Sequence, residues 1–208
     1  FVLKPTPKTV ISTPNGLNAL SQYAGQTVYV ATGTYTLTQP LTIPANTTLI
    51  GGYNSATGVV DPLATPTRLT FSATFQNTML TLNEGTTLDG FFLCDPNGGA
   101  SVMVTLSDNA KGVTPTVRNC VFSGGRNNYM ANGVAATACI FLNRGEQGLL
   151  GCSVTHCTFV GTLGDGYTDG GGNLTNATTR RPTAPSVCEA GHECPEYGLD
   201  GRPLGGHL

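Results

Sequence analysis

An internal repeat constrains this chain more than any other feature of its sequence. The segments Leu41–Gly51 and Leu80–Gly90 carry the same pattern, in which apolar and polar residues alternate and a glycine closes the segment. Stacked coils of a solenoid produce such repeats, because each coil must turn at the same corner to lie on its neighbour. The identical pairs are Leu41/Leu80, Thr42/Thr81, Thr47/Thr86, Thr48/Thr87, Leu49/Leu88 and Gly51/Gly90.

The pattern continues downstream, where Val117–Gly124 aligns with Val154–Gly161. The anchors Leu49, Leu88, Val117 and Val154 are separated by 39, 29 and 37 residues, which indicates constant strands joined by loops of variable length. Since side chains alternate across a strand, the anchors are predicted to point inward. The residues that follow them are predicted to point outward: Ile50, Asp89, Arg118 and Thr155.

The next position is predicted to be the corner of each coil. A sharp bend needs a positive φ, which Gly adopts freely and Asn and His adopt better than most residues. The predicted corner residues are Gly51, Gly90, Asn119 and His156. After the corner, a column of small or sulfur-bearing residues (Gly52, Phe91, Cys120, Cys157) and a column of large apolar residues (Leu93, Phe122, Phe159) are predicted to fill the core.

Composition supports strands over helices. The chain has 28 Gly among 208 residues, no Trp and only 11% charged residues, so it has little material for long amphipathic helices. The net charge of −2 gives no reason to expect nucleic acid as a partner, and no apolar run approaches the roughly 18 residues of a membrane span. The fold class is therefore predicted to be an all-β parallel β-helix.

Three regions are predicted along the chain: an N-terminal arm and cap (1–26), the β-helix (27–162) and an irregular tail (163–208). In the first region, Leu17, Leu20 and Tyr23 have helical spacing, which indicates a short helix that caps the first coil. In the tail, the periodicity gives way to a Gly-rich stretch and a Cys-bearing end.

A resemblance to a known family becomes specific at Thr27–Tyr35 and Leu41–Gly52, which look like the opening of right-handed parallel β-helix proteins of the pectate-lyase-like superfamily. The segments Asn119–Phe122 and His156–Phe159 resemble the Asn-Cys-Thr-Phe repeats of secreted bacterial β-helix proteins, and Leu199–Leu204 resembles the segment before their C-terminal surface anchor. The resemblance implies a right-handed solenoid at an extracellular or cell-surface location. The anchor motif itself is not present in the sequence.

The seven cysteines leave several arrangements open. Secretion would permit disulfide bonds, and an odd number leaves at least one thiol free or shared. Cys188 with Cys194, and Cys139 with Cys152, are the candidate disulfide pairs, whereas Cys120 and Cys157 are equally compatible with unpaired thiols stacked in the core.

No metal or cofactor is expected. Cys188, His192 and Cys194 could form part of a zinc site, but no fourth ligand is evident and a local disulfide explains the same residues. Asp165 and Asp169 place oxygen ligands suited to Ca²⁺ on one loop, although a plain glycine-rich turn accounts for them as well.

The outward column offers the candidate catalytic residues Asp89, Arg118 and His156. β-Helix polysaccharide lyases and hydrolases need paired carboxylates, or a calcium-bound acid with a base. The alternative is an ion pair between Asp89 and Arg118 with a His in a corner conformation. The sequence favours this alternative and a non-enzymatic role, because it lacks the paired-Asp and Gly-His-Gly motifs of the family's hydrolases.

We therefore expect a structural or adhesive module that can assemble into a filament or array, with itself or other surface proteins as partners. Tyr53 and Phe92, taken as equivalent outward positions on successive coils, are the candidate binding residues for a partner chain or a sugar. A polysaccharide lyase or hydrolase, or a carbohydrate-binding module, is the alternative on the same scaffold.

Overall fold

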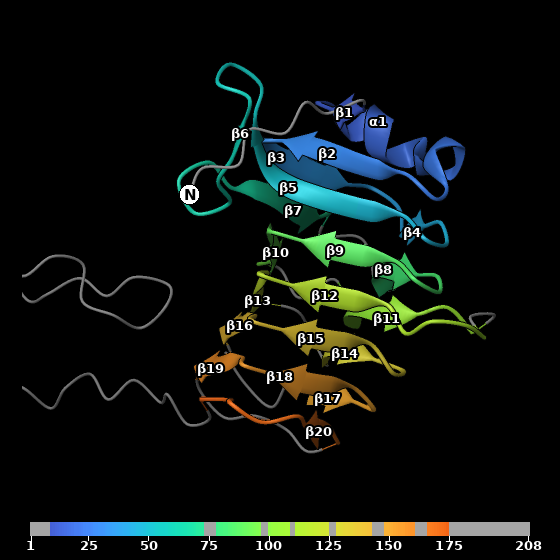
Figure 1. The fold of residues 1–208 in the computed structure, drawn as a ribbon, viewed down its shortest axis with the longest axis vertical. Helices are drawn as coiled ribbons and strands as arrows, with labels where there is room; N and C mark the ends of the chain where they lie inside the picture. Colours follow the sequence, from blue (N-terminus) through green and yellow to red (C-terminus); the bar gives the residue numbers. More distant parts are fainter. Residues whose placement is uncertain are drawn as a thin grey trace, which may run out of the picture.

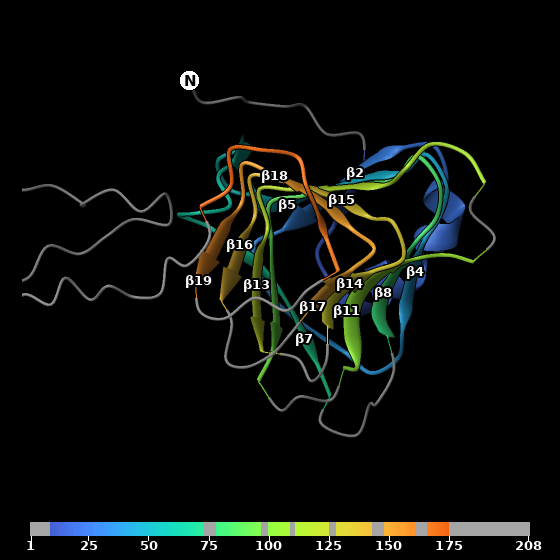
Figure 2. The same ribbon diagram turned by 90° about the horizontal axis from the view of Figure 1, so that it is seen from below.

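The computed structural model is a parallel β-helix, built from three sheets that wrap around one apolar core (Figure 1). It describes residues 9–72, 78–96, 100–108, 111–124, 128–142, 148–160 and 166–174. Seen from below, the sheets enclose the core as three walls, and coil after coil lies in projection over the one before (Figure 2). The predicted fold class is confirmed by these parallel pairings.

The first wall, sheet A, holds the repeat anchors. Its strands lie in the order β1-β2-β5-β9-β12-β15-β18-β20, and the short strand β6 pairs antiparallel with β5. The bounds are β1 Val10–Ile11, β2 Thr27–Ala31, β5 Thr48–Asn54, β6 Val59–Val60, β9 Thr87–Asp89, β12 Thr116–Arg118, β15 Ala135–Thr137, β18 Ser153–Thr155 and β20 Thr168–Asp169.

Sheets B and C form the other two walls. Sheet B contains β3 Gly33–Leu37, β7 Thr67–Phe71, β10 Phe91–Asp95, β13 Val121–Gly124, β16 Ile140–Leu142 and β19 Thr158–Val160. Sheet C contains β4 Leu41–Ile43, β8 Thr78–Leu82, β11 Val102–Leu106, β14 Asn128–Ala131 and β17 Gly148–Leu150.

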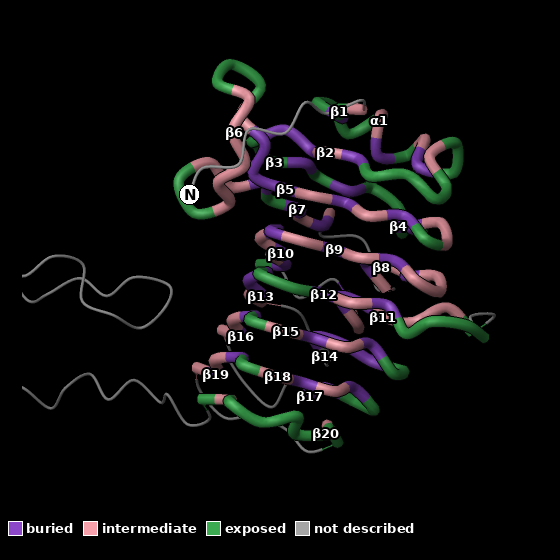
Figure 3. Tube along the Cα trace, in the orientation of Figure 1, coloured by how far each residue is buried: buried purple, intermediate pink, exposed green. Residues whose placement is uncertain are grey.

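The repeat stacks in register, as predicted. Leu41 pairs with Leu80 in sheet C, and Leu49 pairs with Leu88 in sheet A. The inward column Leu49, Leu88, Val117 and Val154 is at most 1% exposed. Figure 3 shows the buried stretches repeating at the same place on each strand. Period-2 alternation thus fixes which side chains enter the core.

The sequence analysis missed one coil. It aligned Val117 directly with Val154, whereas in the structure Val117 pairs with Ala136 and Ala136 pairs with Val154. The long separation between the anchors is therefore a whole extra coil and not a long loop. Ala136 is a small anchor and Ala138 replaces the Gly or Asn expected at the corner, so the repeat was hard to recognise.

The core behind the corner is made of stacked rings. Phe122, Phe141 and Phe159 lie on successive coils, with centroids 4.8 and 5.0 Å apart and interplanar angles of 19° and 9°. Tyr129 packs against the first two rings at 5.9 and 5.6 Å. Each ring is at most 1% exposed, so this stack fills the lower half of the solenoid.

The N-terminal end is capped as predicted, but by two short helices. Thr13 caps α1 (Pro14–Asn18), and a 3-10 helix, η1 (Leu20–Tyr23), follows. Leu17 and Leu20 are fully buried against the first coil. Strand β1 precedes the cap and extends sheet A, while β20 extends it beyond residue 162, so the β structure continues past both predicted boundaries of the β-helix. No helix among the described residues has the length and apolarity needed to cross a membrane.

Candidate functional site

The corner between sheets A and B is the most distinctive line of the surface. One residue in each of five successive coils has a positive φ there: Gly52 (72°), Gly90 (74°), Asn119 (53°), Ala138 (52°) and His156 (52°). Of the four predicted corner residues, Gly90, Asn119 and His156 have this conformation. Gly51 does not, because β5 runs on through it and the register with β2 shifts between Tyr29 and Ala31.

A strap, defined here as residues 55–66 between β5 and β7, covers the upper part of this corner. A Cβ at Gly52 would lie 2.5 Å from Pro62 Cα, and one at Gly90 would lie 3.1 Å from Pro62 Cβ. Both corner positions are therefore glycine for two reasons, the positive φ and the close approach of Pro62. Figure 1 shows the strap as two loops beside the solenoid, one of which rises at β6 while the other projects sideways near β5 and β7.

Local hydrogen bonds hold the strap against the solenoid. Asp61 Oδ1 accepts from the backbone N–H groups of Leu63 (3.1 Å) and Ala64 (2.9 Å). The backbone N–H of Asp61 donates to Gly52 O (2.9 Å), and Thr65 Oγ1 donates to Asp61 O (2.8 Å). The carboxylate acts as a side-chain cap of the Pro62–Ala64 turn, which fixes the direction of the strap.

Below the strap, the corner is open and forms a groove of about 630 Å³. The strap forms its upper wall, the corner residues Asn119, Ala138 and His156 run along it, and the outward side chains of sheet B form its other side. We call this the strap groove. Its lining is Val59–Leu63, Asn119–Val121, Ala138–Ile140, His156 and Thr158.

Two of the candidate catalytic residues, Asp89 and Arg118, are in contact, and the hydrogen bonds of the Asp89 carboxylate are made within the protein. Arg118 Nε donates to Asp89 Oδ2 (2.8 Å) and Asn119 Nδ2 donates to Asp89 Oδ1 (2.8 Å), so both carboxylate oxygens are occupied. The next two coils place Thr137 and Thr155 in register with Arg118. The Arg118 side chain is 49% exposed, so the ion pair contributes at most about 1 kcal/mol. His156 lies apart from this pair, at the lower end of the strap groove.

The candidate binding residues Tyr53 and Phe92 are not equivalent positions on successive coils, so the expected apolar stripe does not form, while the binding role of each residue stays a prediction. Tyr53 lies in sheet A, is 8% exposed and packs on Tyr29 at 5.6 Å. Phe92 lies in sheet B, where Arg68 stacks over its ring at 4.5 Å. The two positions are not equivalent because Gly52, and not Gly51, makes the bend, which leaves Tyr53 on the extension of β5.

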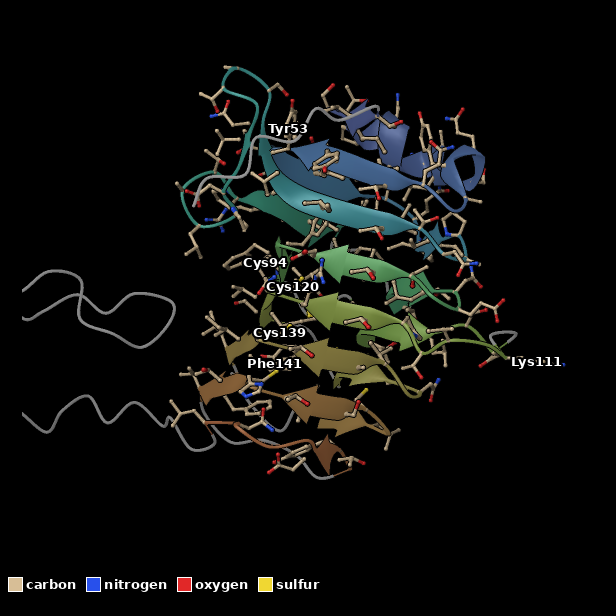
Figure 4. The ribbon with its side chains drawn as sticks, in the orientation of Figure 1. Tyr53, Cys94, Lys111, Cys120, Cys139 and Phe141 are labelled. Atoms are coloured by element: carbon tan, nitrogen blue, oxygen red, sulfur yellow. The ribbon has the colours of Figure 1, made fainter. Side chains whose placement is uncertain are left out.

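Cysteines line the inside of the corner. Cys120, Cys139 and Cys157 follow the corner residues of successive coils and are at most 1% exposed. Figure 4 labels two of them, Cys120 and Cys139, one coil above the other. Phe91 N donates to Cys120 Sγ and Cys139 N donates to Cys157 Sγ, both at 3.4 Å. The sulfurs therefore accept hydrogen bonds from backbone N–H groups at the bend, where strand pairing is interrupted.

The predicted Cys139–Cys152 disulfide is wrong, since both thiols are free. Cys139 stacks between Cys120 and Cys157, whereas Cys152 precedes β18 on the other side of the anchor Val154. Burial raises the pKa of Cys139 well above its ordinary value and that of Cys152 to about 11. A hydrogen bond with Cys139, together with burial, raises the pKa of Cys157. These thiols are thus protonated packing groups at neutral pH.

The remaining candidates fall partly outside the described residues. Cys188, Cys194 and Asp165 lie there. Asp169 Oδ1 accepts from Gly171 N (2.8 Å) and Asn173 Nδ2 (2.6 Å), so this oxygen stabilises a turn. Among the described residues, no group of three His, Cys, Asp or Glu side chains has an arrangement that could hold a metal ion.

Comparison of the chain with protein-family models, curated proteins and solved structures found no match. The role of the strap groove is therefore inferred from its geometry alone. Sequence reasoning found Asn119 and His156 but missed Ala138, whose coil is signalled by Cys139 and Phe141 at the same spacing as Cys120 and Phe122. It also missed the strap, for which the sequence carries no periodic signal.

Proposed function

We propose that this chain is a non-enzymatic structural and adhesive module of the extracellular or cell-surface type, in which a rigid solenoid presents the strap groove to another protein chain. The observation that carries the proposal is the groove itself. Its volume of about 630 Å³ lies within the range of ordinary ligand sites. Mostly apolar walls with a few separate polar groups are suited to recognition of a partner segment.

The distribution of ionisable groups supports recognition over catalysis. Hydrolysis of a glycosidic bond needs two carboxyl groups that face each other across the substrate. Among the residues that line the groove, Asp61 is the carboxylate, and its Oδ1 already accepts two backbone hydrogen bonds. Asp89 is held by Arg118 and Asn119. The groups present can position a ligand, but they do not form an acid–base pair.

The solenoid supports this role because it fixes the groove before any partner arrives. Asn119, Ala138 and His156 belong to successive coils, whose strands are joined by parallel ladders. A preorganised surface loses little conformational entropy on binding. The likeness to the pectate-lyase-like superfamily rests on the sequence patterns at Thr27–Tyr35 and Leu41–Gly52. The surface location rests on the resemblance of Asn119–Phe122, His156–Phe159 and Leu199–Leu204 to segments of secreted bacterial β-helix proteins.

A random-peptide display library tests the groove. Peptides selected on the wild-type protein are expected to lose binding to Ile140→Arg, which places a charged side chain in the groove. They are expected to keep binding to Leu142→Arg, a matched control at the next outward position of β16 and outside the groove lining. If no selected peptide distinguishes these variants, recognition through the groove is wrong.

Incubation with a panel of acidic and neutral polysaccharides tests the non-enzymatic part of the proposal. No chain cleavage is expected, because the carboxylates present do not form a pair. Cleavage by the wild-type protein that disappears in Asp89→Ala or His156→Ala would instead establish an enzyme.

Carbohydrate binding is a second candidate function, favoured by a separate trough of about 390 Å³ on sheet C. Hydroxyl and carboxylate groups line it, including Thr81, Thr105, Ser107 and Asp108. Asn132 Nδ2 donates to Thr105 Oγ1 (3.2 Å), which holds this hydroxyl in place. Affinity electrophoresis in polysaccharide gels is expected to show retardation that Thr105→Val reduces, if this trough binds sugar.

A further inference from the structure

The strap groove has an apolar projection at its upper end. Leu63 is 68% exposed and lines the groove at the strap, together with the half-buried Val59 and Val60. Lower down, Ala138 and Ile140 leave apolar surface open. One face of the molecule therefore carries both a projecting aliphatic side chain and an apolar recess.

The carboxylate and the imidazole of the groove stand at its opposite ends. Asp61 lies in the strap, which packs on Gly52 and Gly90, whereas His156 lies three coils below Gly90. With a strand spacing of ~4.8 Å, this separation is about 14 Å along the solenoid. Asp61 and His156 form no ion pair with each other, and no Lys or Arg is among the residues that line the groove.

Such a face is complementary to itself. In an isologous contact, residue i of one copy meets residue j of the other, and j meets i. A two-fold axis perpendicular to the solenoid, passing through the middle of the groove, would set two copies antiparallel. Leu63 of each copy would then lie on Ala138 and Ile140 of the other, and each Asp61 carboxylate would face an imidazole of His156.

We propose that the partner of the strap groove is a second copy of this chain, bound antiparallel through reciprocal contacts of Leu63 with Ile140 and of Asp61 with His156. This inference rests on the proposed function of the groove as a recognition surface, and it names the occupant. The antiparallel arrangement sets the Asp61 carboxylate, a hydrogen-bond acceptor, against an imidazole of His156, whereas a parallel one would set Asp61 against Asp61.

Sedimentation equilibrium over a range of concentrations tests the inference. The full chain is expected to form dimers, and Leu63→Asp is expected to weaken association by at least about tenfold, because it puts a charge in an apolar contact. Val113→Asp is the matched control, since Val113 is also highly exposed (72%) but lies outside the groove. It is expected to dimerise like the wild type.

A charge cycle tests the orientation. His156→Asp is expected to weaken the dimer through repulsion from Asp61 of the other copy, and Asp tolerates the positive φ at this position. Adding Asp61→Asn is expected to restore most of the association, because Asn keeps an oxygen for the N–H groups of Leu63 and Ala64 but carries no charge.

Three outcomes would overturn the inference: a monomer at every concentration, a dimer unaffected by Leu63→Asp, or failure of Asp61→Asn to restore association. A monomer whose groove still binds selected peptides would remove the self-association alone. If the groove neither mediates self-association nor binds selected peptides, the proposed function is wrong as well.

Discussion

At the scale of single residues, the corner of each coil needs a residue with positive φ. Whether that residue is a glycine depends on how closely other residues pack against it. Gly52 and Gly90 lie under Pro62, whereas Asn119, Ala138 and His156 are exposed and carry side chains despite positive φ values. A left-handed conformation costs a non-Gly residue about 1 kcal/mol. Asn119, Ala138 and His156 have this strained conformation, and their side chains line the groove.

Ala138→Gly is expected to stabilise the protein by about 0.5–1 kcal/mol, because glycine relieves the left-handed strain at φ 52°. Ala135→Gly, three residues earlier in β15, is the control and is expected to destabilise it, since a strand glycine gains no such relief. Urea unfolding of both variants measures the difference. A loss of stability in Ala138→Gly would contradict this account of the corner.

The buried thiols predict a loss of stability at alkaline pH. Below pH 9 the Cys152 thiol is protonated in both the folded and the unfolded chain. Above pH 9 it ionises in the unfolded chain, whereas burial raises its pKa in the folded protein from 9.0 to about 11. Stability is therefore lost as the pH rises through this window, by up to about 3 kcal/mol.

Unfolding midpoints measured from pH 8 to pH 11 check this, with Cys152→Ala as the comparison. The variant is expected to start less stable, because it leaves a small cavity, but to lose less stability as the pH rises. An identical alkaline loss in both proteins would show that Cys152 does not contribute.

At the scale of elements, the strap is an insertion that the solenoid positions through contacts between coils. Thr67 Oγ1, at the start of β7, accepts from Gly52 N (2.7 Å) and lies within hydrogen-bond distance of Ala31 O (3.0 Å). It is fully buried and links the end of the strap to two coils of sheet A. The strap is thus held at its end by Thr67 and along its length by Asp61 and Pro62, while Leu63 stays exposed and can contact a partner.

Gly52→Ala is expected to destabilise the protein by about 3 kcal/mol or more, because the new methyl group would collide with Pro62 in addition to the strain of φ 72°. Gly58→Ala is the matched control, since Gly58 has a similar φ of 69° but no atom within 4 Å of an added Cβ. That variant is expected to lose only about 1 kcal/mol. Equal losses in thermal or urea unfolding would show that strap packing does not fix the corner.

At the scale of the whole molecule, each coil contacts mainly the coils directly above and below it, as in other repeat proteins. Along sheet A, each internal strand pairs with the strand above it and the strand below it, while β1 and β20 each pair with one strand only. Stability is therefore expected to be greatest in the middle of the solenoid and to fall toward both ends.

Hydrogen exchange followed by mass spectrometry checks this gradient. Amides of β9 and β12 are expected to exchange most slowly, and those of β1 and β20 to exchange fastest among the strands of sheet A. Faster exchange in the central coils than in the terminal strands would contradict a core that is continuous from cap to last coil.

The sequence by itself determined the stacking. Alternation is a local property of each strand, so the repeat Leu41–Gly51 and Leu80–Gly90 predicted both the inward columns and the register that the structure shows. The same local rule located Asn119 and His156 as corner residues, because a bend needs a residue that tolerates positive φ. It failed at Ala138, where the corner residue gives no signal.

Only the tertiary structure decided where the groove lies and what lines it. The strap carries no periodicity, and its place depends on the fit of Pro62 over Gly52 and Gly90, which belong to different coils. Likewise, the free state of Cys139 and the separation of Tyr53 from Phe92 follow from the extra coil and the shifted bend. These features depend on contacts between residues that are far apart in the chain. A local sequence pattern does not show which distant residues come into contact.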